Sequence, residues 1–257
     1  MGAVPYPPNS PLHQKAAEPM ALERLAENLN SVRERIEKAA VMAGRDPGEV
    51  TLVAVTKRTP PEWARELFAL NQLEMGENYP QELWTKADTL QDLPEIHWHM
   101  IGHIQTNKLK RILPVVRMIH AVDSLKLLTA VADLLPLAPH LTQICLQVNL
   151  SEEESKHGWS ADSIRAEADQ IARLIEAQKI PVTGLMTIAG WGTDGATARP
   201  TFIKLRLLSE ELKARTGLPL RDLSMGMSGD FEAAIAEGAT HVRVGSSLFA
   251  GLEEAEA

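Results

Sequence analysis

Hydrophobic and polar positions follow one repeating pattern along most of the chain. From about residue 50 onward, a short apolar run is followed by a polar turn and then by a segment with the apolar spacing of an amphipathic helix, and this unit occurs eight times. Strands that alternate with helices form parallel sheets with right-handed crossovers. The pattern therefore predicts an α/β protein, with strands at 52–55, 73–77, 97–101, 118–122, 143–149, 182–188, 222–227 and 241–246.

Eight units in about 200 residues favour a closed (β/α)8 barrel of the TIM type over an open doubly wound sheet. The G-x-G-x-x-G motif of dinucleotide-binding sheets is also missing after the first apolar run. Signals for helix boundaries fit the barrel. Thr59, Ser124, Ser160, Tyr79-Pro80 and Arg199-Pro200 precede amphipathic segments, with Thr59 as an expected N-cap, and Gly217 and Gly238 close two helices.

The first 50 residues have a different pattern. Apolar residues from Leu22 to Ala43 recur in steps of three and four, which predicts an extra N-terminal helix that stops at Gly44. The spacing is also compatible with a coiled coil, but a helix packed on its own domain is favoured. Residues 1–19 hold five prolines and predict a disordered tail, which leaves 20–257 as a single barrel domain.

Composition narrows the classes of partner. The 257 residues include 26 Lys and Arg against 34 Asp and Glu, so the formal net charge is −8. This balance argues against binding to nucleic acid or to anionic lipid surfaces. No apolar run approaches the roughly 18 residues of a membrane span. The single cysteine, Cys145, suits a reducing compartment and a place in the core, so we expect a soluble cytoplasmic protein.

Candidate chemistry lies where the predicted strands end, because TIM barrels carry their active sites there. Lys57 follows a wholly apolar run, so we expect a partly buried stem and an amine at the barrel mouth, where desolvation favours the neutral, nucleophilic form. By position alone, a solvated lysine is the simpler interpretation. Ser228 and Ser246 lie in Gly-Ser turns after the seventh and eighth strands, where barrels often bind phosphate. Together these features suggest an aldehyde that carries a phosphate.

Seven short motifs stand in order along the chain. They are Thr56-Lys57, Gly76-Glu77-Asn78-Tyr79, Trp98-His99-Met100-Ile101-Gly102, Gln105-Thr106-Asn107-Lys108, Gly184-Leu185-Met186, Met225-Gly226-Met227-Ser228 and Arg243-Val244-Gly245. In these motifs the chain strongly resembles the pyridoxal phosphate homeostasis protein family, single barrels related to the N-terminal domain of alanine racemase. The resemblance covers about residues 20–250.

The resemblance implies that Lys57 carries pyridoxal 5′-phosphate (PLP) as an internal aldimine. It implies phosphate contacts from Ser228, Gly245 and Ser246, although threonine is common in the family where Ser246 stands. Asn78 and His99 would line the pocket. Arg243 would face the pyridine nitrogen and, since an arginine keeps its proton, would leave that nitrogen unprotonated and the ring a poorer electron sink.

We therefore expect a monomeric protein that stores, buffers or delivers PLP, with PLP-dependent apo-enzymes as candidate partners and no catalytic residues. The alternative is an amino-acid racemase. That activity needs a second base, which the racemase family takes from a tyrosine of a further domain, and here the chain ends soon after the eighth strand, with only Tyr6 and Tyr79. A Schiff-base aldolase, in which Lys57 attacks a sugar-phosphate ketone, is a third interpretation, and weak racemase activity is compatible with the same residues.

The sequence predicts no metal site. His97 and His99 share one face of the third strand and His103 lies nearby, but no cysteine or obvious carboxylate in the same run completes a ligand set. Pocket lining or packing is the favoured role of these histidines.

Overall fold

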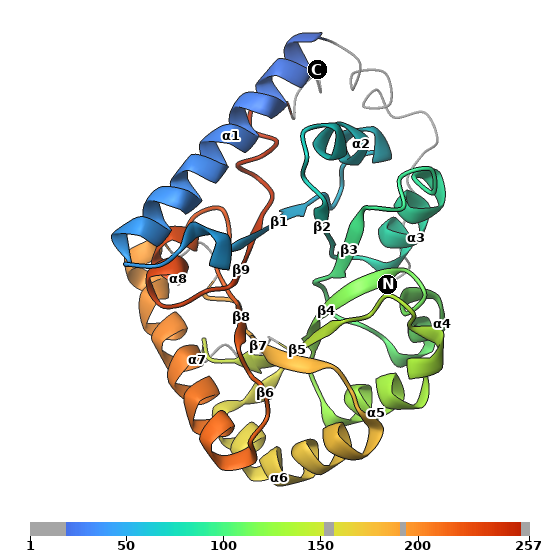
Figure 1. Cartoon of the computed structure of the whole chain (residues 1–257), viewed down its shortest axis with the longest axis vertical. Helices are drawn as coiled ribbons and strands as arrows, with labels where there is room; N and C mark the ends of the chain where they lie inside the picture. Colours follow the sequence, from blue (N-terminus) through green and yellow to red (C-terminus); the bar gives the residue numbers. More distant parts are fainter. Residues whose placement is uncertain (1–18, 152–156, 191–193, 253–257) are drawn as a thin grey trace.

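The structure, a computed structural model, describes residues 19–151, 157–190 and 194–252, and it has the closed parallel barrel that the sequence predicts (Figure 1). Eight strands follow the order β4-β3-β2-β1-β9-β8-β7-β5, and a pairing of β4 with β5 closes the ring. The strands are β1 (Thr51–Val55), β2 (Glu74–Glu77), β3 (His97–Met100), β4 (Val116–Val122), β5 (Gln143–Asn149), β7 (Val182–Met186), β8 (Asp222–Ser224) and β9 (His241–Val244). A two-residue strand, β6 (Trp159–Ser160), adds to β5.

Helices surround this ring of strands (Figure 1). They are α1 (Pro19–Met42), α2 (Pro61–Ala69), α3 (Pro80–Thr89), α4 (Leu109–Ile112), α5 (Leu125–Asp133), α6 (Ala161–Gln178), α7 (Gly195–Thr216) and α8 (Phe231–Ala236), with short 3-10 turns η2 (Pro47–Glu49), η3 (Thr106–Lys108) and η4 (Leu135–Leu137). All eight predicted strands are present, and the structural ones end up to three residues earlier at their carboxyl ends.

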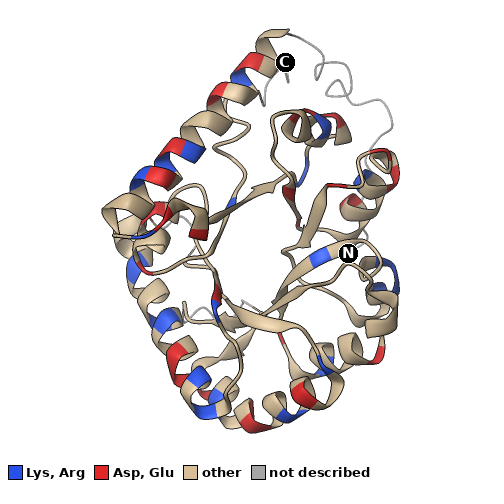
Figure 2. Ribbon diagram, viewed as in Figure 1, with Lys and Arg blue, Asp and Glu red and all other residues tan. Residues whose placement is uncertain are grey.

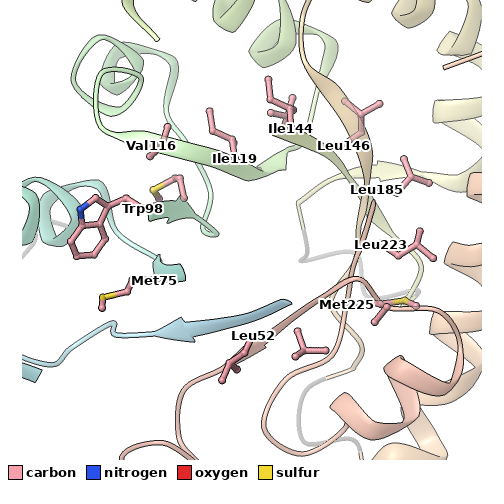
Figure 3. Packing of buried hydrophobic residues seen from close by; sticks show 14 of the residues in the cluster. Leu52, Met75, Trp98, Val116, Ile119, Ile144, Leu146, Leu185, Leu223 and Met225 are labelled. Atoms are coloured by element: carbon pink, nitrogen blue, oxygen red, sulfur yellow. The ribbon is translucent and has the colours of Figure 1, made fainter. Parts of the chain in front are cut away.

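Most of the hydrophobic core lies between the strands and the helices. Figure 3 shows residues such as Leu52, Ile144 and Leu185 pointing outward from the strands toward this layer. Alternate residues point into the barrel, as a period of two requires. A small inner cluster of Met118, Ala121, Cys145 and Met186 fills part of the interior. Cys145 is fully buried, as predicted, and burial raises the pKa of its thiol well above the usual value.

Helix α1 packs on its own barrel, which confirms the favoured interpretation over a coiled coil. Its predicted apolar stripe is buried at Leu25, Leu29, Val32 and Ile36. Asn28 donates hydrogen bonds to the carbonyls of Leu248 and Ala250, and so ties the helix to the chain that follows β9. The helix begins at Pro19, one residue before the predicted boundary, and residues 1–18 of the predicted tail lie outside the described residues.

Two of the predicted helix starts are wrong. Helix α2 has Pro60 rather than Thr59 as its N-cap, because the Thr59 hydroxyl donates backward to the Thr56 carbonyl. Helix α7 begins well before Arg199-Pro200, because Asp194 caps it by accepting from the Thr197 N–H at 2.9 Å. Pro200 consequently lies inside the helix. Ser124 and Ser160 directly precede α5 and α6, as predicted, and both are N-caps, whereas Gly217, with φ +73°, ends α7.

Charged side chains of both signs are interspersed over the outer helices, without a single-sign stripe in the view of Figure 2. Within the described residues, no helix is long and apolar enough to cross a membrane.

Candidate functional site

Lys57 lies at the barrel's carboxyl end, two residues beyond the last residue of β1. The chain turns away from the barrel at this point. Arg58 adopts φ +62°, and its N–H donates to the Glu82 carboxylate at 2.9 Å. Lys57 is therefore exposed at the barrel mouth. Its amine has no hydrogen bond or ion pair with any residue that the structure describes, which leaves it available for a ligand.

A second lysine lies beneath this turn, and its amine is fully engaged. Lys86 on α3 is buried and donates to the Glu77 carboxylate and to the Thr56 carbonyl. The Thr56 hydroxyl donates to the same oxygen of Glu77. Burial raises the pKa of Glu77, and the contacts with Lys86 and Thr56 oppose that rise. Since Thr56 directly precedes Lys57, this buried trio fixes the backbone from which Lys57 projects.

The two glycine-serine turns lie beside Lys57, because β1, β9 and β8 are neighbours in the ring. Ala54 of β1 pairs with Val244 of β9, and Gly245 follows directly. A Cβ atom on Gly245 would lie 3.2 Å from the Val55 carbonyl oxygen, so a side chain there would crowd the end of β1. Ser246 is exposed. The mouth thus brings Lys57 and the β9 turn together, as the sequence predicts.

The turn after β8 converges on the same place. The backbone N–H groups of Gly245 and Ser247 both point to the Ser228 hydroxyl oxygen, at 3.3 and 3.4 Å. Gly226 has φ +94°, and a Cβ atom there would lie 2.7 Å from the Ala234 Cβ, so only glycine fits. Two N–H groups that converge on one oxygen form a small concave donor site, which is the arrangement that proteins use to bind anions.

Asn78 comes directly after β2 and is half-buried. It packs against Gly102, where a Cβ atom would lie only 2.1 Å from the Asn78 carbonyl oxygen. The Asn78 backbone is therefore clamped against the loop that follows β3. This position places Asn78 on the mouth next to the β1 turn, since β1 and β2 are paired.

Arg243 points into the barrel from β9 and is 4 % exposed. Its guanidinium donates to the Ser224 hydroxyl at 2.6 Å and to the Thr187 carbonyl at 3.0 Å. Ser224 is the last residue of β8, and Thr187 directly follows β7, so the guanidinium lies just below the mouth. Burial lowers the pKa of Arg243 to about 10, and the side chain therefore remains charged at neutral pH.

A chain of hydrogen bonds runs from Arg243 down through the barrel. The Ser224 hydroxyl contacts Nδ1 of His120 at 2.6 Å, and Nε2 of His120 contacts Nδ1 of His99 at 2.8 Å. Nε2 of His99 contacts the Glu74 carboxylate at 2.6 Å. Burial, together with the charges of His99, His241 and Arg243, lowers the pKa of His120 well below its usual value, so His120 is neutral.

When both imidazoles are neutral, the groups at the two ends of this hydrogen-bond chain determine which atom donates in each bond. A guanidinium can only donate and a carboxylate can only accept. His99 must then donate from Nε2 to Glu74 and accept at Nδ1 from His120. His120 accepts in turn from the Ser224 hydroxyl, which accepts from Arg243. The chain thus joins a cation below the mouth to an anion at the start of β2.

His99 consequently lies inside the barrel, toward its other end. It lines a cavity of about 450 Å³ at the amino ends of the strands, together with Arg45, Glu49, Thr51, Glu74, Arg117, Gln143, Arg221, Asp222, Thr240 and His241. Burial disfavours the charge of Glu74, but hydrogen bonds and charge from His99 and His97 outweigh it and lower its pKa to about 2. Within this lining Arg45 pairs with Glu49, Glu74 pairs with His99, and Asp222 accepts a hydrogen bond from Gln143.

Sequence reasoning missed the partners of these residues. His120, Ser224 and Glu74 join His99 to Arg243, and Glu77 with Lys86 supports the Lys57 turn. A signal was present for Glu77, which is a carboxylate at the end of an otherwise buried strand. The contacts of His120 and Ser224, which are 104 residues apart, had no signal in local spacing.

Comparisons with known proteins agree with this architecture. The family model described as alanine racemase, N-terminal domain, matches residues 20–253. A pyridoxal phosphate homeostasis protein from Pseudomonas aeruginosa is 41% identical over 228 residues, which are 89% of this chain and 96% of that protein. The protein of that name from Homo sapiens is 36% identical over 233 residues, covering 86% and 84%. The structure of PipY from Synechococcus elongatus with PLP bound matches with a TM-score of 0.75 and 36% identity, over 88% of this chain and 99% of that one.

Proposed function

The chain belongs to the pyridoxal phosphate homeostasis protein family, whose barrel is that of the alanine racemase N-terminal domain, and on this premise we propose that it binds PLP and takes part in its homeostasis. The bound cofactor would lie at the carboxyl ends of β1, β2, β8 and β9. PLP supplies an electrophilic aldehyde and an electron-accepting ring. The observation that carries the proposal is the free amine of Lys57 beside the converging N–H groups of the β8 and β9 turns.

Lys57 is the residue we assign to the aldehyde. Its amine is exposed and unpaired among the described residues, whereas Lys86 is held by Glu77 and Thr56. Lys108 lies elsewhere, with its amine 5.8 Å above the ring of Trp84. Condensation of a lysine amine with an aldehyde needs a neutral amine that can reach the carbonyl carbon, and Lys57 meets the geometric part of that requirement.

The phosphate would be bound by Ser228, Gly245 and Ser246. The Ser228 hydroxyl oxygen now accepts from the N–H groups of Gly245 and Ser247, and a phosphate oxygen can take that position while the hydroxyl turns to donate to it. Ser246 is exposed beside them and can donate a further hydrogen bond. The short helix α8 follows the first of these turns. Asn78, clamped on the adjoining strand end, would line the pocket.

Arg243 would face the ring nitrogen. Ser224 and Thr187 hold its guanidinium, and its pKa of about 10 keeps it protonated at neutral pH. A protonated guanidinium only donates hydrogen bonds and cannot accept one from a pyridinium N–H, so it disfavours protonation of the ring nitrogen. An unprotonated ring withdraws electrons less strongly, which supports storage, buffering or delivery of the cofactor rather than catalysis.

His99 contributes differently from the expectation of direct contact. It is 2 % exposed, and its two ring nitrogens are engaged with His120 and Glu74. We propose that His99 supports Arg243 through His120 and Ser224 and lies below the cofactor.

The proposal is tested by locating the cofactor on the protein. Purified protein loaded with PLP should be yellow, and borohydride should bleach it and fix the cofactor irreversibly. Peptide mass mapping after reduction should then place the added mass on the peptide that contains Lys57. Added mass on another lysine would reject this site. A homeostasis role further predicts that the loaded protein restores activity to a PLP-dependent apo-enzyme, and retention of all cofactor in that assay would exclude delivery.

A further inference from the structure

Three side chains outside the proposed cofactor site gather at the same end of the barrel. His103 lies in the loop after β3, Asp123 directly follows β4, and His157 lies before β6. Their ligand atoms all lie within 4.8 Å of one another. Nδ1 of His103 is 2.7 Å from the Asp123 carboxylate, and Nδ1 of His157 is 3.9 Å from the same oxygen. In the ring of strands, β4 lies across the mouth from β8 and β9.

The side chains are accessible and their backbones are fixed. The side chains of His103 and His157 are 43% and 61% exposed, whereas that of Asp123 is 10% exposed. His103 is held between Gly102, which packs against the Asn78 backbone, and the buried Ile104. The carbonyl of His157 accepts a hydrogen bond from the Gln147 side chain of β5 at 2.9 Å. Three separate strand ends thus present the three groups.

The Asp123 carboxylate is also oriented by a hydrogen bond from its neighbour Ser124. Its Oδ1 accepts a hydrogen bond from the Ser124 hydroxyl at 3.0 Å, and Ser124 in turn caps helix α5. Its other oxygen, Oδ2, therefore remains for the two imidazoles. A carboxylate held by a neighbouring group on one oxygen and open on the other is the usual arrangement of a metal ligand with an outer hydrogen bond.

The separations suit a small transition-metal ion. Tetrahedral Zn²⁺ with bonds of 2.0–2.1 Å places its ligand atoms about 3.3 Å apart. The observed separations of 2.7 and 3.9 Å lie on either side of this value, so shifts of roughly half an ångström would equalise them. The imidazole rings are stacked, with centroids 3.9 Å apart and planes 13° apart. Rotation of the exposed His157 ring would turn its Nδ1 toward a shared ion.

We propose that His103, Asp123 and His157 bind one divalent transition-metal ion of the Zn²⁺ class. Two imidazoles and one carboxylate favour Zn²⁺, Fe²⁺ or Co²⁺ over Mg²⁺ and Ca²⁺, which prefer oxygen ligands. Three protein ligands leave at least one coordination position for water or for an oxygen of a small ligand. The proposed metal site shares no residue with Lys57 or the phosphate turns, so a test of metal binding does not depend on whether PLP binds.

This proposal departs from the sequence prediction of no metal site for a simple reason. That prediction paired His103 with His97 and His99 and found no carboxylate in the same run. The structure brings the carboxylate from the next strand and the second imidazole from the strand after it, at separations of 20 and 34 residues from Asp123.

Metal binding by the full-length protein, freed of metal with a chelator, tests the proposal. Titration with Co²⁺ should give one bound ion per chain and a visible d–d absorption band, which Zn²⁺ removes and Mg²⁺ does not. The variants His157→Ala and Asp123→Asn should each weaken binding by at least about tenfold, since loss of even an outer partner of a metal ligand costs that much. His140→Ala removes an exposed histidine elsewhere on the surface and should leave binding unchanged.

Thermal unfolding gives a second measurement that does not depend on the colour. Zn²⁺ should raise the unfolding midpoint of the wild-type protein and of His140→Ala, because an ion that binds only the folded state stabilises it. It should not raise that of His157→Ala, whose midpoint without metal shows that the variant is folded. Wild-type binding no tighter than that of His157→Ala, or an equal loss in His140→Ala, would overturn the proposal.

Discussion

The two ends of the barrel use polar residues in opposite ways. At the amino end, a cavity of about 450 Å³ has several polar groups that are already paired, such as Glu74 with His97 and His99, and Arg45 with Glu49. At the carboxyl end, Lys57 and Ser246 are exposed, and two backbone N–H groups converge on the Ser228 hydroxyl. The cavity is at one end, and the exposed Lys57 amine, with two N–H groups that make only long hydrogen bonds to Ser228, is at the other.

The contrast shows that a cavity and a binding site are different things. Polar groups that are already paired gain little from a ligand, because binding must first break their hydrogen bonds. Donors that point toward a common position gain a partner at small cost. In TIM barrels the amino end generally serves stability and the carboxyl end serves function. Here the chain of hydrogen bonds that runs from Glu74 to Arg243 connects the two ends through the barrel interior.

The largest expected effect is at the carboxyl end. Lys57→Ala should abolish the covalent bond to PLP, and borohydride should fix no cofactor to the variant. The side chain is exposed, so its loss leaves no cavity and the thermal midpoint should stay close to that of the wild type. Lys110→Ala, which removes another exposed lysine, is the control and should bind as the wild type does. A reducible yellow band in Lys57→Ala would mean that another lysine holds the cofactor.

The next effect concerns the phosphate turns. Each hydroxyl that donates to a charged phosphate oxygen is worth about 1.5–3 kcal/mol, so Ser228→Ala with Ser246→Ala should weaken PLP binding by on the order of a hundredfold or more. The backbone N–H groups remain, so binding should not vanish. Binding of pyridoxal, which lacks the phosphate, should change little when measured in parallel. An equal loss for both ligands would show that the serines shape the pocket without gripping phosphate.

A smaller effect is expected when the pH is lowered. The stability of the folded barrel should then depend on the buried imidazoles of the interior hydrogen-bond chain. Burial lowers the pKa of His120 and His241 below the usual 6.5, so below pH 6.5 the unfolded chain binds more protons than the folded barrel. Stability should therefore fall as the pH falls, by up to about 1.4 kcal/mol per pH unit for each imidazole. Glu74, lowered from 4.5 to about 2, adds a further loss between those values.

Thermal midpoints measured from pH 7.5 to pH 5 check this dependence. His140→Ala should keep the wild-type slope, because that histidine is exposed. A flat wild-type profile would mean that these imidazoles bind protons equally well in the folded and the unfolded state, which would contradict the lowering of the pKa of His120 and His241 by burial.

The smallest effect on stability should come from a substitution in the amino-end cavity. Arg117 donates to Nε2 of His97 at 3.1 Å, so Arg117→Ala should cost about 0.5–1.5 kcal/mol of stability, the usual worth of one hydrogen bond. The affinity for PLP should not change, as measured by equilibrium titration. A loss of affinity comparable to that of the serine variant would remove the distinction between the two ends.

The sequence by itself determined the barrel and the residues that its strand ends carry to the mouth. Eight apolar runs, each followed by a helical pattern, predict parallel pairing, and a parallel barrel places every strand's carboxyl end on one side. Lys57, Asn78, Ser228, Gly245 and Ser246 accordingly lie at that end. These features depend on local periodicity, which is encoded within each unit.

Only the tertiary structure decided which side chains meet in the interior and across the mouth. His99 pairs with His120 and Glu74, and Asp123 approaches His103 and His157, because neighbouring strands fix the register between segments that are distant in sequence. The exposure of Lys57 likewise depends on the turn at Arg58 and its bond to Glu82. Such contacts depend on register and packing, which no single stretch of sequence specifies.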